Sequence, residues 1–72
     1  MDGNKDYHFT ERESEILKEV VLGKNNTQIA GEMFLSIHTV KFYVSSILYK
    51  LSVNSRIEAA VKAVKEHIIE TE

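Results

Sequence analysis

A cation, an aromatic ring and a hydroxyl lie close together near the middle of the chain, at Lys41, Phe42 and Ser45. They belong to a stretch from Met33 to Ile57 that contains no Asp or Glu, although acidic residues outnumber basic ones by 11 to 9 over the whole sequence. Lys can bond guanine or phosphate, Phe can pack against a thymine methyl group, and Ser can bond a base edge. The stretch therefore suits a polyanion such as duplex DNA.

A helix is required to bring these three side chains to one face. Ser36 is a suitable N-cap residue, and the sequence after it keeps helical periodicity up to Leu51. The apolar residues that define one continuous face are Val40, Val44, Ile47, Leu48 and Leu51. We therefore predict a helix from about Ile37 to Leu51 with this face buried.

The outward face of this predicted helix presents Phe42 and Ser45, with His38 and Tyr49 close to them and Lys41 at one flank. An outward Phe has alternatives, because scattered hydrophobic residues are common on protein surfaces and a loop or a dimer partner can also cover the ring. Together with Lys41, Ser45 and the lack of acids, however, Phe42 favours contact with base edges in a DNA groove. We predict that Lys41, Phe42 and Ser45 contact the bases.

Three further helices are predicted around this one. The first begins at Thr10, which forms a capping box with Glu13, and it ends at Gly23. A short second helix begins at Asn25 and ends only a few residues before the next, as a helix-turn-helix requires. The fourth helix begins after Ser55. Its predicted buried stripe comprises Ile57, Val61, Val64 and Ile68.

These patterns predict one all-α domain, a four-helix bundle in which the second and third helices form a helix-turn-helix and a fourth helix is C-terminal. We expect residues 1–8 to be a disordered lead-in or linker remnant and residues 9–70 to fold. The three histidines, His8, His38 and His67, are too widely spaced for a metal motif, and cysteine is absent. We expect no metal, cofactor, catalytic set or membrane span. The net charge of −2 indicates that any nucleic-acid contact is a local patch.

Further side chains near the ends of these helices are candidates for DNA phosphate contacts. Lys50 and Arg56 are equally well explained as solvated charges, Asn26 as part of a helix cap, and Tyr43 as a core residue with an exposed hydroxyl. Thr39 is either a local helix-start hydroxyl or a phosphate ligand at the helix N-terminus. The full set of candidates is Asn26, Thr27, Ser36, His38, Thr39, Tyr43, Lys50 and Arg56.

Small side chains on the fourth helix suggest a contact with a second copy of the chain. Ala59 and Ala63 are expected on the side away from the buried stripe, where a second helix could approach closely. The simpler alternative is that Ala is a good helix former. We predict a homodimer contact at Ala59 and Ala63, with Lys62 and Glu66 beside them.

The order and spacing of these motifs resemble the LuxR/FixJ/NarL-type, GerE-like family of helix-turn-helix DNA-binding domains. The resemblance covers roughly residues 9–69. The motifs that carry it are Thr10-Glu11-Arg12-Glu13, Gly23 followed by Asn26, Ile29-Ala30, Ser36 with Thr39-Val40-Lys41, Lys50-Leu51-Ser52-Val53, and Arg56 with Ala59-Ala60-Val61. No single motif is decisive, but their joint order is specific.

The resemblance implies the cytoplasmic output domain of a transcriptional regulator, with the third helix in the major groove and the fourth in a homodimer interface. It assigns base contacts to Lys41, Phe42 and Ser45, and phosphate contacts to Thr39, Lys50 and the start of the second helix. The fourth helix is most similar to NarL-type response regulators, in which an N-terminal receiver domain precedes this one. RNA polymerase is a further expected partner. The chain is then an excised C-terminal half, or a free-standing member similar to GerE.

A different class of function stays open from the sequence. The chain could be a small helical protein-interaction module that contacts the transcription machinery through Phe42 and Tyr49. Such a module would bind a protein with little dependence on salt and would not bind duplex DNA.

Overall fold

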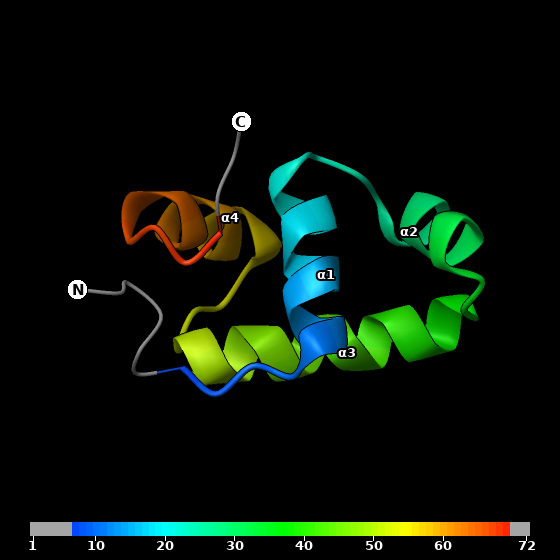
Figure 1. The fold of residues 1–72 in the computed structure, drawn as a ribbon, viewed down its shortest axis with the longest axis horizontal. Coiled ribbons are helices and arrows are strands. Elements are labelled where there is room, and N and C mark those ends of the chain that lie inside the picture. Colours follow the sequence, from blue (N-terminus) through cyan, green and yellow to red (C-terminus); the bar gives the residue numbers. More distant parts are fainter. Residues whose placement is uncertain (1–6, 70–72) are drawn as a thin grey trace.

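The computed structural model describes residues 7–69, and within that range the chain forms four α-helices and no β-strand (Figure 1). The helices are α1 (Glu11–Val21), α2 (Asn26–Met33), α3 (Ile37–Leu51) and α4 (Arg56–Lys65). The predicted all-α fold is confirmed, with α2 and α3 as the helix-turn-helix. No helix in the described range is long and apolar enough to cross a membrane. The predictions for residues 1–6 and for residue 70 fall outside the described residues.

Local hydrogen bonds define where the helices begin. At α1, Thr10 Oγ1 accepts a bond from the Glu13 backbone N–H at 3.1 Å, and the Glu13 carboxylate accepts one from the Thr10 N–H at 2.8 Å. Asn25 and Gln28 form the same reciprocal pair at α2, and serine hydroxyls cap α3 and α4. These bonds satisfy backbone donors that a helix start leaves unpaired, so the starts follow from residues three apart in sequence.

Helix α1 packs against both α3 and α4, while α2 packs on α3 (Figure 1). The N-terminal end of α1 meets α3, and its C-terminal end points away from α3. The inward face of α3 contacts the other three helices. The largest fully buried side chains of the resulting core are Ile16, Leu17, Ile29, Val40, Ile47 and Leu51. Burial of one face of α3 leaves the opposite face of that helix exposed.

The turn between α2 and α3 depends on a left-handed residue. Phe34 ends α2 with a φ of 57°, and the next N–H, that of Leu35, donates to the Ala30 carbonyl at 2.9 Å. The left-handed conformation costs a residue other than glycine about 1–2 kcal/mol. The Phe34 ring is also almost fully exposed. This strained residue keeps the link short, so that α2 and α3 remain adjacent.

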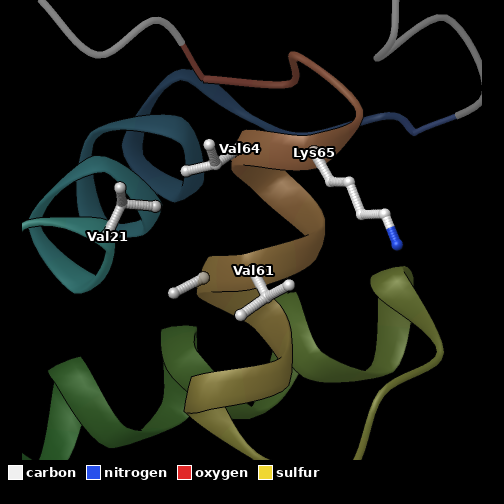
Figure 2. Close-up of a pocket in the computed structure, with 5 residues that line it drawn as sticks. Val21, Val61, Val64 and Lys65 are labelled. Carbon is white, nitrogen blue, oxygen red and sulfur yellow. The ribbon is translucent and has the colours of Figure 1, made fainter.

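The face of α4 that is buried in the core is opposite to the face predicted from the sequence. Ala59 and Ala63 are only 1% and 0% exposed, whereas Ile57, Val61 and Val64 are 74%, 56% and 44% exposed. The prediction failed for these three residues because α4 carries an apolar stripe on each side and the larger residues were assigned to the core. Ile68, the fourth residue of the predicted stripe, does belong to the core. The small alanine side chains instead allow α4 to lie close to α1 and α3. Figure 2 shows Val61 and Val64 on α4 around a pocket that is also lined by Val21 of α1.

The folded part of the chain begins earlier than the predicted boundary at residue 9. The Tyr7 hydroxyl donates to the Glu66 carboxylate at 2.9 Å, and the Tyr7 ring stacks on Phe9 with 5.8 Å between ring centroids. The His8 carbonyl accepts a bond from Lys50 Nζ at 2.9 Å. Tyr7 and His8 are therefore part of the folded domain, and the prediction of a disordered lead-in is wrong for these two residues.

Candidate nucleic-acid interface

The outward face of α3 carries the three predicted base-contacting side chains in exposed positions. Lys41 and Ser45 are exposed, and Phe42 is 69% exposed even though its ring meets the edge of Tyr43 at 5.7 Å between centroids. Helix α3 contains no carboxylate, so nothing on it would repel a phosphate. The placement of these side chains agrees with the helical phase predicted from the sequence.

The two hydroxyl groups at the start of α3 differ in whether their proton is still free to donate a hydrogen bond. Ser36 Oγ accepts a bond from the Thr39 N–H at 3.0 Å and donates to Thr39 Oγ1 at 2.9 Å. Because a hydroxyl has one proton, Ser36 has used its donor, whereas Thr39 retains its own. Thr39 is thus the better phosphate donor of the two. His38 is exposed beside them, and Tyr43 is half-buried against the core.

Arg56 joins the start of α4 to the start of α2. Its Nη1 donates to Asn26 Oδ1 at 2.7 Å, and its Nη2 donates to the Lys24 carbonyl at 2.9 Å. Both terminal guanidinium nitrogens therefore take part in an internal link, and the predicted phosphate contact by Arg56 stays a prediction. Asn26 has its amide oxygen occupied, which leaves its amide N–H groups as the donors that can face a phosphate. Thr27 is exposed next to it.

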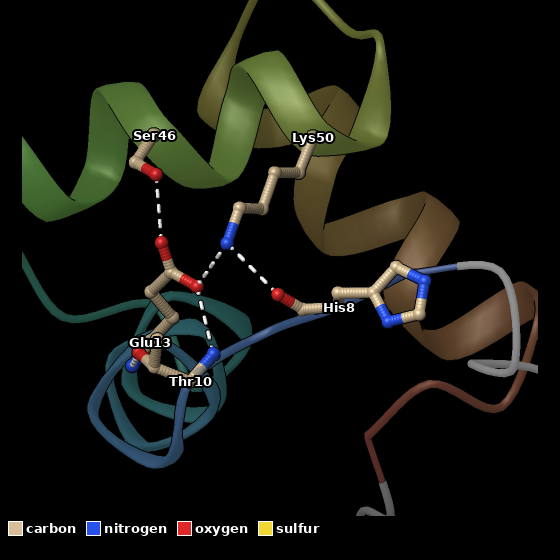
Figure 3. A network of polar contacts seen from close by, with 5 residues as sticks. All are labelled: His8, Thr10, Glu13, Ser46 and Lys50. Atoms are coloured by element: carbon tan, nitrogen blue, oxygen red, sulfur yellow. Dashed lines mark hydrogen bonds and ion pairs between the residues drawn. The ribbon is translucent and has the colours of Figure 1, made fainter.

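Lys50 lies in a hydrogen-bonded network on the inner side of α3, shown in Figure 3. Its Nζ donates to Glu13 Oε1 at 2.7 Å and to the His8 carbonyl at 2.9 Å. Ser46 Oγ donates to the other oxygen of the same carboxylate at 2.7 Å. The ammonium group also lies 5.9 Å from the centre of the Phe9 ring. Lys50 therefore forms an internal ion pair with Glu13, and its predicted phosphate contact stays a prediction.

The buried carboxylate of Glu13 stays ionised because its partners outweigh its burial. Burial alone raises the pKa of Glu13, since water no longer solvates the charge. Hydrogen bonds from Lys50, Ser46 and the Thr10 N–H, together with the charge of Lys50, act the other way and lower the pKa from 4.5 to about 2. The network thus fixes α3 to α1 at neutral pH.

The four predicted dimer residues are engaged within the monomer. Ala59 and Ala63 belong to the core. Lys62 Nζ donates to the Leu51 carbonyl at 2.7 Å and lies 5.8 Å from the centre of the Tyr7 ring, while Glu66 accepts the Tyr7 hydroxyl. The predicted contact of Ala59 and Ala63 with a second copy is therefore wrong, because neither side chain reaches the surface.

The sequence analysis missed the apolar surface that α4 presents instead. A shallow groove of about 450 Å³ runs between the end of α1 and α4 (Figure 2). Its lining residues are Val21, Ala60, Val61, Val64 and Lys65. The signal for this groove was present in the sequence, because α4 is apolar on two sides and a helix at the surface of so small a domain can bury only one of them.

Comparison with known proteins identifies the family of this domain. A model of the GerE family, described as bacterial regulatory proteins of the luxR family, matches residues 7–63. The chain belongs to this family. The match includes α1, α2, α3 and most of α4, so the resemblance predicted from the sequence is confirmed.

The relatives of this LuxR-family domain include proteins named as transcriptional regulators. The chain is 45% identical over 64 residues to the uncharacterized transcriptional regulatory protein YhcZ of Bacillus subtilis, covering 89% of this chain and 30% of YhcZ. It is 45% identical over 61 residues to the transcriptional regulatory protein LiaR of Bacillus subtilis, covering 85% of this chain and 29% of LiaR. The chain therefore spans about 30% of the length of these relatives.

A solved structure shares the fold of this LuxR-family domain. The crystal structure of the response regulator ChrA, from a haem-sensing two-component system, superposes with a TM-score of 0.82 at 35% identity. The match covers 86% of this chain and 31% of ChrA. Family and fold together make the chain a helix-turn-helix domain of a transcriptional regulator. The contacts of individual residues with DNA stay predictions.

Proposed function

We propose that this LuxR-family domain binds double-stranded DNA sequence-specifically and is the output domain of a two-component response regulator. The observation that carries the proposal is the exposed, carboxylate-free outward face of α3, with Lys41, Phe42 and Ser45 on it. The names of relatives such as the response regulator VraR of Staphylococcus aureus support the second part.

In the proposed complex, α3 lies in the major groove, which is about 12 Å wide and accepts one helix. Lys41 bonds a guanine or a nearby phosphate, Phe42 packs on a thymine methyl group, and Ser45 bonds a base edge. The phosphate contacts come from side chains that remain available at the helix ends. These are Asn26, Thr27, His38, Thr39 and Tyr43. Lys50 and Arg56 also hold α3 and α2 in place through their internal bonds.

We propose further that the domain binds DNA as a homodimer through the exposed side of α4. Ile57, Val61 and Val64 expose large aliphatic side chains on a helix of only 10 residues. The groove beside Val21 could receive such side chains from a second copy. With few cations facing DNA, a single domain would bind weakly, and two copies would supply affinity and register on two half-sites.

The full-length protein is proposed to carry an N-terminal receiver domain and to act on RNA polymerase at its promoters. Support for the receiver domain comes from the relatives, because this chain matches only about 30% of their length and the rest has room for a further domain. The solved neighbour ChrA belongs to a two-component system and is likewise matched over 31% of its length.

The proposal is tested by selecting bound duplexes from a random pool and titrating the best one with salt. We expect one enriched motif with two related half-sites and an affinity that falls as salt rises. Phe42 and the even more exposed Tyr49 also keep the protein-interaction alternative open. That alternative predicts that no duplex is enriched and that binding to a protein partner barely changes with salt.

A further inference from the structure

Near the C-terminal end of α3, Tyr49 is 86% exposed, which is unusual for a side chain with so large an apolar ring. Tyr49 points away from the buried face of α3, nearly opposite Val40 and Leu51, so within residues 7–69 no other helix covers its ring. Its exposed ring and hydroxyl are therefore available to a binding partner.

Helical geometry puts Tyr49 on the same side as the proposed base-contacting residues. Tyr49 follows Phe42 by seven positions and Ser45 by four, so at 100° per residue it points within about 40° of both. Seven residues span about 10.5 Å along the axis at 1.5 Å each. Where α3 crosses the groove at an angle with Phe42 over the bases, this distance is comparable to the groove width of about 12 Å and brings Tyr49 to one of the phosphate strands.

The neighbouring cation does not compete for this strand. Lys50, the only charged residue in the last turn of α3, points inward to Glu13 and the His8 carbonyl (Figure 3). A phosphate beside this end of α3 would therefore meet the Tyr49 hydroxyl rather than an ammonium group. A phenol can donate one hydrogen bond to a phosphate oxygen, and its ring can pack on the adjacent sugar.

We propose that Tyr49 binds the DNA backbone at the far edge of the major groove through its hydroxyl group. The inference rests on the proposed function of α3 and adds a contact at its C-terminal end, opposite the phosphate donors at its N-terminal end. Because the hydroxyl is neutral, this contact strengthens binding without releasing a counterion, in contrast to a Lys at the same place.

The test compares Tyr49→Phe and Tyr49→Lys with the parent chain on the duplex selected above. Tyr49→Phe should weaken binding about two- to tenfold, equally for matched and mismatched duplexes, with an unchanged salt slope. Tyr49→Lys should steepen the slope of log K against log salt by about 0.9, because it adds one cation at a phosphate. Leu22→Lys is the control, since Leu22 is exposed at the end of α1 that points away from α3, and its slope should not change.

Each other outcome overturns a stated part of the argument. If the parent binds the duplex and Tyr49→Lys leaves the salt slope at the parent value, Tyr49 does not lie at a phosphate. If Tyr49→Phe weakens the matched duplex alone, Tyr49 contacts a base instead. If the parent chain itself binds no duplex, the proposed function fails together with this inference. Thermal unfolding of all three variants should match the parent because both positions are exposed.

Discussion

At the scale of single residues, the Glu13 carboxylate makes the stability of the domain depend on acid. Its pKa is lowered to about 2 in the folded state from an ordinary value of 4.5. A lowered pKa means that the ionised form stabilises the fold, fully above pH 4.5, and that this contribution is lost as pH falls towards 2. The difference corresponds to about 3 kcal/mol as an order of magnitude.

We expect Glu13→Gln to remove this part of the acid dependence. The free energy of unfolding, measured with urea from pH 7 to pH 2, should fall more steeply in the parent than in the variant below pH 4.5. Glu11→Gln, an exposed carboxylate in the same helical turn, is the matched control and should keep the parent slope. Parallel curves for the parent and Glu13→Gln would show that Glu13 is not the titrating group.

Lys41 and Phe42 should carry sequence discrimination. Replacing Lys41 with Ala should cost about 1–3 kcal/mol of binding free energy on the selected duplex if Lys41 pairs with a guanine, and less on a duplex with that base pair changed. Phe42→Ala should relax selection at a thymine position. Both side chains are exposed, so the fold should not change.

The measurement is the ratio of dissociation constants for matched and changed duplexes. Lys18→Ala, an exposed cation on α1, is the control and should leave that ratio unaltered. Unchanged ratios for both Lys41→Ala and Phe42→Ala would mean that the outward face of α3 does not contact the bases.

At the scale of helices, α4 has one face in the core and an opposite, exposed face that is proposed to contact a second copy. Ala63→Leu should destabilise the fold by about 1–3 kcal/mol, because a larger side chain does not fit a fully packed site. Val61→Lys should leave stability unchanged but weaken cooperative binding to a duplex with two half-sites, about tenfold or more, since a buried Val contributes about 1.5–3 kcal/mol.

Thermal unfolding and binding titrations together check the assignment of the two faces. A lowered melting temperature for Val61→Lys together with an unchanged one for Ala63→Leu would show that Val61, and not Ala63, lies on the buried face. If Val61→Lys binds the duplex with unchanged cooperativity, the exposed side of α4 is not the dimer contact.

The helices could be predicted from the sequence largely because their boundaries are local. Thr10 with Glu13 and Asn25 with Gln28 lie three residues apart, and the phase of α3 follows from its own apolar spacing. The exposure of Phe42 followed from the same phase. What depends on distant neighbours was missed. The face of α4 that is buried is decided by how closely α1 and α3 approach it.

Long-range pairing also explains why the internal bonds of two candidate site residues could not be predicted. Lys50 bonds Glu13, 37 positions away, and Arg56 bonds Asn26, 30 positions away. A cation in a sequence carries no sign of such partners. The sequence therefore identified the exposed side chains on α3 but could not show which cations also hold the helices together.

At the scale of the whole molecule, two domains on one duplex should require a fixed phase between half-sites. Half-sites read by a two-fold dimer lie about one helical turn, 10–10.5 base pairs, apart. Inserting about five base pairs between them rotates one half-site to the opposite side of the duplex, and we expect affinity to fall to that of a single half-site.

Gel-shift titrations of the selected duplex, the five-base-pair insertion and a single half-site measure this effect. A ten-base-pair insertion restores the phase but moves the half-sites one further turn apart, so a dimer held by a direct α4 contact should lose cooperative binding there as well. Equal affinity for all spacings would indicate that the domains bind independently of one another.

The segment that leads into α1 is fastened at two points, by Tyr7 to Glu66 after α4 and by the His8 carbonyl to Lys50 on α3. The backbone that enters α1 is therefore positioned against both α3 and the segment after α4, so the start of α1 is set relative to the two helices that are proposed to meet DNA and a second copy.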